Sequence, residues 1–358
     1  MNNVAGKRLV GLDSLRGIAA TMIIFFHVLY LGGYAEKTIL TPVVSKLDIG
    51  VRLFYALSAF SLFYGYEMKI DKNGAIKDFY VGRFFRIAPL FYLCIVFYLF
   101  ALPLLFNADV AETEILADVT FIFGLLPGKQ ESIVWAGWSI GVEWIFYFVF
   151  PLIVMLNRSL MNTIIIFVIS AFVFYRFGFF GNELKKISES AFDLNFFNQF
   201  MFFSAGIVSY NLYKAIDFNK KSFRLVFPIV SIPFLWLYFF TDMINNRFGD
   251  VLIAVCFVFL ILYFSCFPPK IFTNRFFISV GLSSFGLYLI HPIVLILYMQ
   301  TGFLQRVHFS EHESLSYVLT FILTFILTFL LAYCSYHYYE RPLMKFGKSI
   351  LNKNANSK

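Results

Sequence analysis

An arginine and a histidine stand eleven residues apart in the first apolar stretch of the chain, at Arg16 and His27. Eleven helical residues complete about three turns, so the two side chains would share one helix face, about 16.5 Å apart along the axis. A guanidinium suits phosphate binding, and an imidazole suits proton transfer near neutral pH. The pair therefore fits a long ligand with a phosphorylated head near Arg16 and a reactive end near His27.

A second pair of basic residues, Arg83 and Arg86, lies three positions apart at the start of a later apolar stretch. Residues at this spacing share a helix face, so the pair could form an anion clamp beside Arg16. Arginines that flank a membrane span also follow from topology alone, because cytoplasmic loops are enriched in Lys and Arg. The spacing leaves both interpretations open.

Ser139 and Glu143 are four residues apart and would stack on one helix face. The expected direction of their span places Glu143 about 7 or 8 Å below the outer surface, at a depth similar to that of His27. A carboxylate there could orient His27 or bind an acceptor hydroxyl, and the serine could donate to a developing oxyanion. The structural alternative is a serine bonded to its own helix and a glutamate at the membrane interface.

Other polar residues also interrupt apolar stretches, and ionisable groups inside a membrane are costly enough to be functional candidates. Pro292 removes a backbone hydrogen bond beside His291, which would let a pocket open. Arg176, near a span end, fits a structural role. The remaining candidates for a pocket are Asp13, Arg52, Tyr288, His291 and Glu340.

The chain that carries these polar side chains is unusually apolar. Of 358 residues, 60% are hydrophobic and 14% are charged, against roughly 45 to 50% and about 25% in soluble domains. The apolar segments are long enough to cross a hydrocarbon core about 30 Å thick as helices. We therefore expect an all-α fold, a polytopic transmembrane helical bundle of about ten spans. The expected spans are 15–33, 47–66, 87–106, 138–157, 162–180, 196–214, 225–241, 251–267, 278–300 and 315–339.

The stretch 116–127 is apolar but too short to cross, and it predicts a re-entrant or interfacial piece. Lys and Arg are concentrated in the loops on the side of the two chain ends, which predicts that both termini are cytoplasmic. The first stretch has no small-x-small cleavage site, so we expect it to be retained as a span.

The domain organisation is expected to be simple. Residues 8–345 form one transmembrane domain, whose last span ends at Glu340-Arg341-Pro342. Residues 346–358 form a polar cytoplasmic tail, which we expect to be disordered beyond Leu351.

Charge and cysteine content exclude two classes of partner. The net charge is +8, but the basic residues lie in short loops between spans rather than in one patch, so no nucleic acid is expected. The four cysteines lie in or beside apolar segments without CxxC spacing, which predicts neither a disulfide framework nor a metal site. They are Cys94, Cys256, Cys266 and Cys334.

The segment Leu12–Ala20, followed by His27, resembles the opening Arg-x10-His signature of the acyltransferase-3 membrane family. Further motifs of that family follow in the family's order, and the resemblance covers Gly11 to Pro342. These motifs are Gly50–Phe60, Arg83 with Arg86, Trp138-Ser139 with Glu143, Tyr288–Pro292 and Glu340–Pro342. Ala59 and Ser14 replace glycines that are common in relatives, a difference that concerns packing rather than chemistry.

The resemblance implies an integral-membrane O-acyltransferase that takes an acyl group, usually acetyl, from acetyl-CoA as co-substrate on the cytoplasmic side, with no bound cofactor. Its usual acceptors are hydroxyls of cell-surface glycans such as O-antigen, capsule or exopolysaccharide. The implied partners are acyl-CoA, a glycan or lipid-linked sugar acceptor and membrane lipids. The implied location is the cell membrane, specifically the bacterial cytoplasmic membrane, as a multi-pass protein of the cell envelope.

The family roles carry over residue by residue. His27 would be the catalytic histidine, with Glu143 and Ser139 lining the centre. The CoA phosphates would be bound by Arg16, Arg83 and Arg86. Longer members carry a fused esterase-like domain, which does not follow the last span here. We therefore expect the acceptor to be acylated by the membrane core or by a separate extracytoplasmic partner.

An alternative function uses the same residues. Buried His, Arg and Glu side chains could form a proton relay in an exporter of sugars or lipid-linked intermediates. A sensor or scaffold without chemistry would leave the clustered charges unexplained. Within acyl transfer, direct transfer to the acceptor and a relay of the acyl group across the bilayer both remain open.

Overall fold

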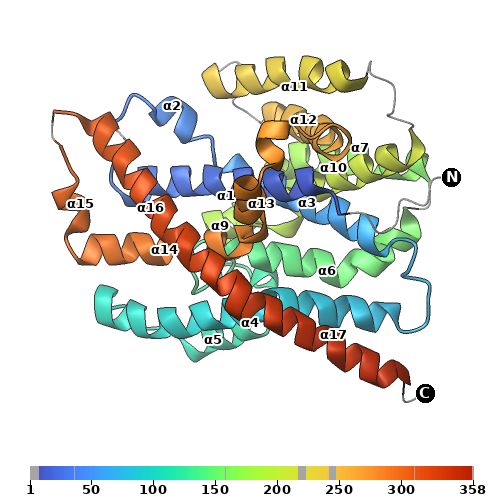
Figure 1. Ribbon diagram of the computed structural model, residues 1–358, viewed down its shortest axis with the longest axis horizontal. Helices are drawn as coiled ribbons and strands as arrows, with labels where there is room; N and C mark the ends of the chain where they lie inside the picture. The colour runs from blue at the N-terminus through green and yellow to red at the C-terminus, as the bar shows by residue number, and fades with distance from the viewer. Residues whose placement is uncertain are drawn as a thin grey trace.

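The helices form an elongated bundle, with both chain ends marked on the same side (Figure 1). The computed structural model describes residues 8–35, 37–157, 159–216, 223–241, 247–309 and 311–356, and within these residues it contains helices but no strand. Five of the basic residues on which the predicted orientation rests lie outside the described residues: Lys7, Arg158, Lys220, Lys221 and Lys358. The prediction of an all-α polytopic bundle is confirmed.

Eight helical segments of the described residues are long and apolar enough to cross a membrane. They are α1 (Val10–Leu31), α2 with α3 (Thr41–Val44, Ile49–Tyr66), α4 (Ala75–Phe106), α6 (Trp138–Leu156), α7 (Leu160–Phe180), α11 (Phe223–Phe240), α12 (Arg247–Cys266) and α16 with its continuation (Glu313–Ser335 onward). Figure 1 shows α11 along one edge of the bundle and α4 with α5 (Glu112–Val119) along the opposite edge.

The predicted span 278–300 is not one straight helix. It is divided into α13 (Arg275–Leu282) and α14 (Ser284–Gln300), which meet at an angle of 71°. Helix α14 continues through Pro292. The break falls at Ser283, two residues after Gly281, where α13 contacts the backbone of α1.

The predicted span 196–214 corresponds to α10 (Phe196–Ala215). This helix is long enough to cross a membrane but is not apolar enough to be counted among the eight segments above. Its polar residues do not face lipid, because Asn198, Gln199, Ser204 and Ser209 are all buried. Helix α10 packs between α3 and α7. With α10 and the bent pair included, the described helices account for all ten predicted spans.

The last long helix does not end at Glu340-Arg341-Pro342, the predicted end of the last span. Helix α16 passes into a π-helix (Tyr336–Glu340) and then directly into α17 (Arg341–Asn356). The wider i→i+5 bonding of the π turn changes the hydrogen-bond pattern immediately before Pro342, so the missing proline N–H does not end the helix. Of the tail from Leu351 to Lys358, for which disorder was predicted, α17 includes the part as far as Asn356, and the last two residues lie outside the described residues.

The remaining described elements are short. The stretch 116–127 does not cross the bundle: it holds the end of α5 and one 3-10 turn (Phe123–Leu125), as expected for a non-spanning segment. The other short helices are α8 (Asn182–Ile187), α9 (Glu189–Asp193), a 3-10 helix (Lys270–Thr273) and α15 (Phe303–Arg306).

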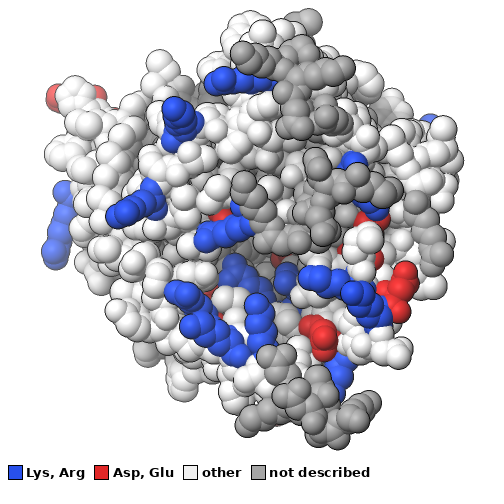
Figure 2. Space-filling model, turned by 45° about the vertical axis from the view of Figure 1, so that its right-hand side comes forward, with Lys and Arg blue, Asp and Glu red and all other residues white. Residues whose placement is uncertain are grey.

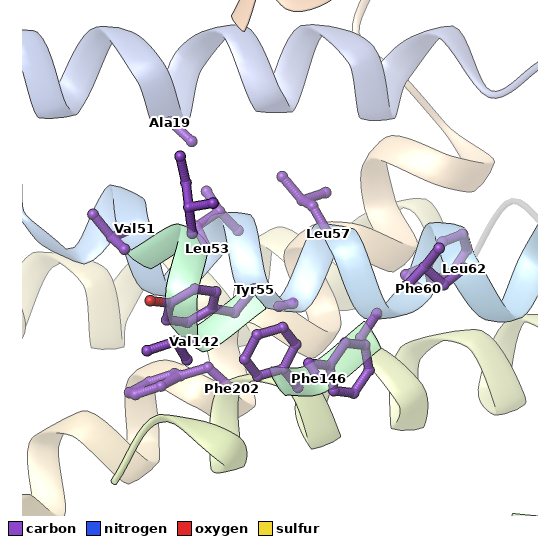
Figure 3. Close-up of a cluster of buried hydrophobic side chains, with 14 of the residues drawn as sticks. Ala19, Val51, Leu53, Tyr55, Leu57, Phe60, Leu62, Val142, Phe146 and Phe202 are labelled. Atoms are coloured by element: carbon purple, nitrogen blue, oxygen red, sulfur yellow. The ribbon is translucent and has the colours of Figure 1, made fainter. Parts of the chain in front are cut away.

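Aromatic rings from three helices fill the centre of the bundle. Tyr55 of α3 and Phe146 of α6 both stack on Phe203 of α10, with ring centroids 4.5 and 4.2 Å apart. Figure 3 shows Tyr55 and Phe146 in this cluster, with Ala19 pointing from α1 toward α3. Stacked rings bury large apolar areas and fix the relative positions of the helices that carry the polar residues.

Glycines set how closely several helices approach. A Cβ atom on Gly206 would lie 2.0 Å from the carbonyl oxygen of Ala56, so α10 and α3 touch backbone to backbone. Gly281 makes a similar contact, because its Cβ would lie 1.9 Å from the carbonyl oxygen of Asp13 in α1. Small residues at helix crossings are the main route to close packing in membranes, where burial of apolar surface does not drive association.

We expect Gly206→Ala to lower the stability of the folded protein by about 1 to 3 kcal/mol, because the new methyl must push α10 away from α3. Gly65→Ala is the matched control, since Gly65 also lies in a helix but nothing lies within 4 Å of its added Cβ. Thermal unfolding in detergent, followed by tryptophan fluorescence, compares the two variants. Equal midpoints would contradict the close approach of α3 and α10.

Candidate active site

Two histidines from different helices meet inside the bundle. His27 of α1 and His291 of α14 face each other with 2.9 Å between Nδ1 of His27 and Nε2 of His291. Each ring also approaches a carbonyl of its own helix: Nδ1 of His27 lies 3.1 Å from the oxygen of Ile23, and Nδ1 of His291 lies 3.0 Å from that of Leu287. His291 is completely buried, whereas His27 keeps a partly accessible edge.

Tyr288 and Ser139 lie beside this pair. The ring of Tyr288 is 6.1 Å from that of His291, centroid to centroid, and its hydroxyl donates to the carbonyl of Ala136. The hydroxyl of Ser139 lies 2.7 Å from the same phenol oxygen. Because a phenol has a single hydrogen to donate, Ser139 must be the donor in this second bond. Ser139 therefore holds Tyr288, rather than facing Glu143.

Glu143 does not orient His27. One of its oxygens, Oε1, accepts hydrogen bonds from Ser58, at 2.5 Å, and from the hydroxyl of Tyr147. The spacing of residues along the helix did not predict either of these donors to Glu143. Tyr147 follows Glu143 by four residues on the same helix face, a signal that was available, whereas Ser58 comes from α3 and is brought there by packing. The partner that the sequence argument sought for His27 is His291.

Arg16 lies at the other end of α1 from His27. Its guanidinium donates to Asp13, at 3.1 Å, and to the hydroxyl of Ser61 in α3. Arg16 also feels the charges of Arg83 and Arg86 electrostatically. Three arginines from two helices are thus within electrostatic range of one another, and their use as a single anion site stays a prediction.

Arg83 and Arg86 lie within α4, which begins earlier than predicted, and they face different neighbours. The guanidinium of Arg83 lies over the rings of Tyr66 and Tyr147, 5.8 and 5.9 Å from their centroids. Its buried Nε has no hydrogen-bond partner among the described residues. Because Tyr147 also donates to Glu143, Arg83 is connected to the carboxylate through one phenol.

Arg86 pairs with a buried carboxylate. It lies 3.3 Å from Glu340, whose side chain is only 2% exposed and also accepts a bond from Ser335 at 3.1 Å. Glu340 is the last residue of the π-helix, and π turns occur frequently at functional sites. Glu340, which the motif places at the end of a span, thus supplies the counter-ion of Arg86.

Among the described residues, Arg52 forms no hydrogen bond or ion pair with the histidine pair or with the three arginines Arg16, Arg83 and Arg86. It forms a 2.5 Å ion pair with Asp250 of α12 and lies over the ring of Phe202, 5.3 Å from its centroid. This half-buried pair joins α3 to α12, which is a structural role.

Basic residues gather at one end of the molecule. Figure 2 turns forward the side on which Figure 1 marks the chain ends, and it shows many Lys and Arg side chains there with fewer Asp and Glu. A basic face of this kind attracts anionic ligands and follows the pattern of cytoplasmic loops.

A strained loop covers the region of Tyr288. Phe121, Ser132 and Ala136 adopt left-handed backbone conformations with φ of 59°, 70° and 63°, which are uncommon for residues other than glycine. Such strain persists where the surroundings enforce it and is often found at functional sites. Here Ala136 is held through its carbonyl by Tyr288.

The same loop is anchored by a buried carboxylate. Asp118, at the end of α5, accepts hydrogen bonds from the hydroxyl of Ser132 at 2.8 Å and from the backbone N–H of Ile133 at 2.9 Å. Burial raises the pKa of Asp118 from its ordinary 3.8 to about 6, although the two hydrogen bonds oppose the shift.

This raised pKa predicts a pH-dependent stability. A carboxyl whose pKa is higher in the folded state binds its proton more tightly there, so folding is penalised as pH rises from about 4 to about 6. Lowering the pH from 7 to 5 should therefore remove part of the penalty from Asp118 and raise the melting temperature. Asp118→Asn keeps an acceptor oxygen but cannot ionise, so its gain over the same change should be smaller. Identical pH slopes in the two proteins would contradict the raised pKa.

Among the described residues, no group of three or more His, Cys, Asp or Glu side chains is placed to hold a metal ion. The polar groups that the described residues bring to this region are the two imidazoles, the Glu143 carboxylate with its hydroxyl donors, and the three arginines.

Comparison with known proteins gives one family and one relative. Residues 9–337 match the family described as Acyltransferase domain, of the acyltransferase-3 type. The chain is also similar to a protein of Acidianus two-tailed virus named "Putative acetyltransferase ORF330", with 24% identity over 292 residues, which is 78% of this chain and 81% of the viral protein. No solved structure gives a significant match.

Proposed function

Because the match spans nearly the whole of its length, the chain belongs to the acyltransferase-3 family, and we propose that it moves an acyl group, most simply acetyl, from acyl-CoA to a hydroxyl of a cell-surface or lipid-linked glycan. It is thus a membrane acyltransferase, and the donor and the acceptor are the proposed part. The similarity to a viral protein named as an acetyltransferase supports acetyl as the group.

The observation that carries the proposal is the separation of charge and base along α1. Arg16 shares an electrostatic cluster with Arg83 and Arg86 at one end, and His27 lies about 16.5 Å further along the helix. The phosphates of acyl-CoA suit the arginine cluster, because guanidinium groups form strong bonds to phosphate oxygens. The long pantetheine arm would then carry the thioester toward His27.

The reaction needs a base that takes a proton from the acceptor hydroxyl and later gives it to the leaving thiolate. The hydroxyl oxygen of the acceptor attacks the thioester carbonyl carbon while His27 takes the hydroxyl proton. A tetrahedral oxyanion forms and collapses, the carbon–sulfur bond breaks, and the thiolate takes the proton back from His27 to leave as CoA thiol. The products are an acylated glycan and free CoA, and His27 is again neutral.

Proteoliposomes that contain the purified chain test the proposal. Acetyl-CoA labelled in the acetyl group is supplied outside or inside the vesicles, together with a lipid-linked oligosaccharide. We expect labelled acetyl on the oligosaccharide and one free thiol for each acetyl transferred. An exporter would instead move the sugar across the bilayer without consuming thioester, and that result would overturn the proposed function.

A further inference from the structure

We propose that His291 is a positioning residue that fixes the tautomer of His27, so that the proton of His27 sits on Nδ1 and the catalytic base is Nε2. This inference rests on the proposed function and deepens it, because it names the atom that takes the proton. The position of the proton on each ring follows from the atoms that its nitrogens contact.

The tautomer of His291 is set by its own helix. Its Nδ1 lies 3.0 Å from the carbonyl oxygen of Leu287, and a carbonyl oxygen can only accept a hydrogen bond, so Nδ1 of His291 carries a proton. The ring is fully buried and no carboxylate contacts it among the described residues, which favours the neutral imidazole. A neutral imidazole has one N–H, so Nε2 of His291 presents a lone pair.

That lone pair points at His27. Nε2 of His291 lies 2.9 Å from Nδ1 of His27, and the carbonyl oxygen of Ile23 lies 3.1 Å from the same Nδ1. Both neighbours accept, so Nδ1 of His27 must donate and must carry the single proton of the neutral ring. Nε2 of His27 is consequently unprotonated, and no hydrogen bond occupies it within the described part of the chain.

The arrangement also helps His27 after it has reacted. When Nε2 takes the proton of the acceptor hydroxyl, the ring becomes an imidazolium whose Nδ1–H is still bonded to His291. A base held in the correct tautomer by a third group is the logic of catalytic triads, in which the orienting group is usually a carboxylate. Here a neutral imidazole fills that place, as suits a site buried in the membrane. The proton then passes from Nε2 to the departing thiolate, so no proton is left on the pair.

Two substitutions of His291 separate positioning from packing. His291→Phe keeps the ring volume but cannot accept a hydrogen bond, and we expect its turnover number to fall about 10- to 100-fold with an unchanged KM for acetyl-CoA. His291→Gln places an amide oxygen near the position of Nε2 and should recover part of the loss. His337→Phe, at a half-buried histidine outside the pair, is the control for introducing phenylalanine.

A measurement independent of activity completes the test. Long-range proton–nitrogen NMR of histidine-labelled protein in nanodiscs, assigned with His27→Gln, reports which nitrogen of His27 is protonated. We expect a proton on Nδ1 and a bare Nε2 in the wild type, and a growing Nε2–H population in His291→Phe. Wild-type turnover in that variant, or an Nε2–H tautomer in the wild type, would overturn the inference. If the wild type transfers no acetyl, the proposed function fails, yet the NMR result still decides the tautomer.

Discussion

Replacement of His27 by alanine should reduce acyl transfer by about 10²- to 10⁴-fold, the range expected when a general base is removed. The substitution removes the proton acceptor but leaves Arg16 and the arginine cluster in place, so the KM for acetyl-CoA should change little. The measurement is the initial rate of labelled acetyl transfer in proteoliposomes. Because His27 packs against His291, its folding must be checked at the same time.

A matched control for this variant is His312→Ala, which makes the same chemical change at an exposed histidine before α16. That variant should transfer acetyl at the wild-type rate. The melting temperature of His27→Ala should stay close to that of the wild type. Full activity in a folded His27→Ala protein would remove His27 from the mechanism and, with it, the role assigned to His291.

Arg86→Ala should have the largest effect on stability, about 3 to 5 kcal/mol, because it leaves the buried Glu340 without its counter-ion. The same change should raise the KM for acetyl-CoA by about 10-fold or more, since a charge-assisted hydrogen bond to phosphate contributes about 1.5 to 3 kcal/mol. Thermal unfolding and steady-state kinetics measure the two effects separately. Arg275→Ala, at an exposed arginine that begins α13, is the control for loss of a surface charge.

A double variant distinguishes the two roles of Arg86. Adding Glu340→Gln to Arg86→Ala removes the stranded carboxylate, so much of the lost stability should return. The KM should remain high, because the phosphate contact is still missing. A double variant that regains both stability and KM would show that Arg86 has only a structural role, and it would exclude this arginine from the proposed acyl-CoA site.

The pairing of Arg86 with Glu340 bears on how an anion would enter. Two arginines of the cluster already form ion pairs with carboxylates: Arg16 with Asp13, and Arg86 with Glu340. A bound phosphate would therefore share these guanidinium groups, which present several donors each. Arg83 forms no such ion pair among the described residues, and its guanidinium lies over the rings of Tyr66 and Tyr147.

Hydrophobicity alone determined the membrane fold and nearly all of its spans, because a helix that faces lipid must be apolar over its whole length. Helical spacing placed Arg16 and His27 on one face of α1, and motif order indicated an acyltransferase. The same reasoning could not detect the sharp bend between α13 and α14, because that bend follows from the contact of Gly281 with the backbone of α1, far away in sequence.

Contacts between helices decided the composition of the site. Spacing within one helix paired Ser139 with Glu143, but the fold gives Ser139 to Tyr288 and gives Glu143 to Ser58. His27 and His291 are separated by 264 positions, and no periodicity could bring them together. The sequence shows which face of each helix is polar. Only the packing of the helices determines which of these faces contact each other, and that contact decides the partner of each buried polar group.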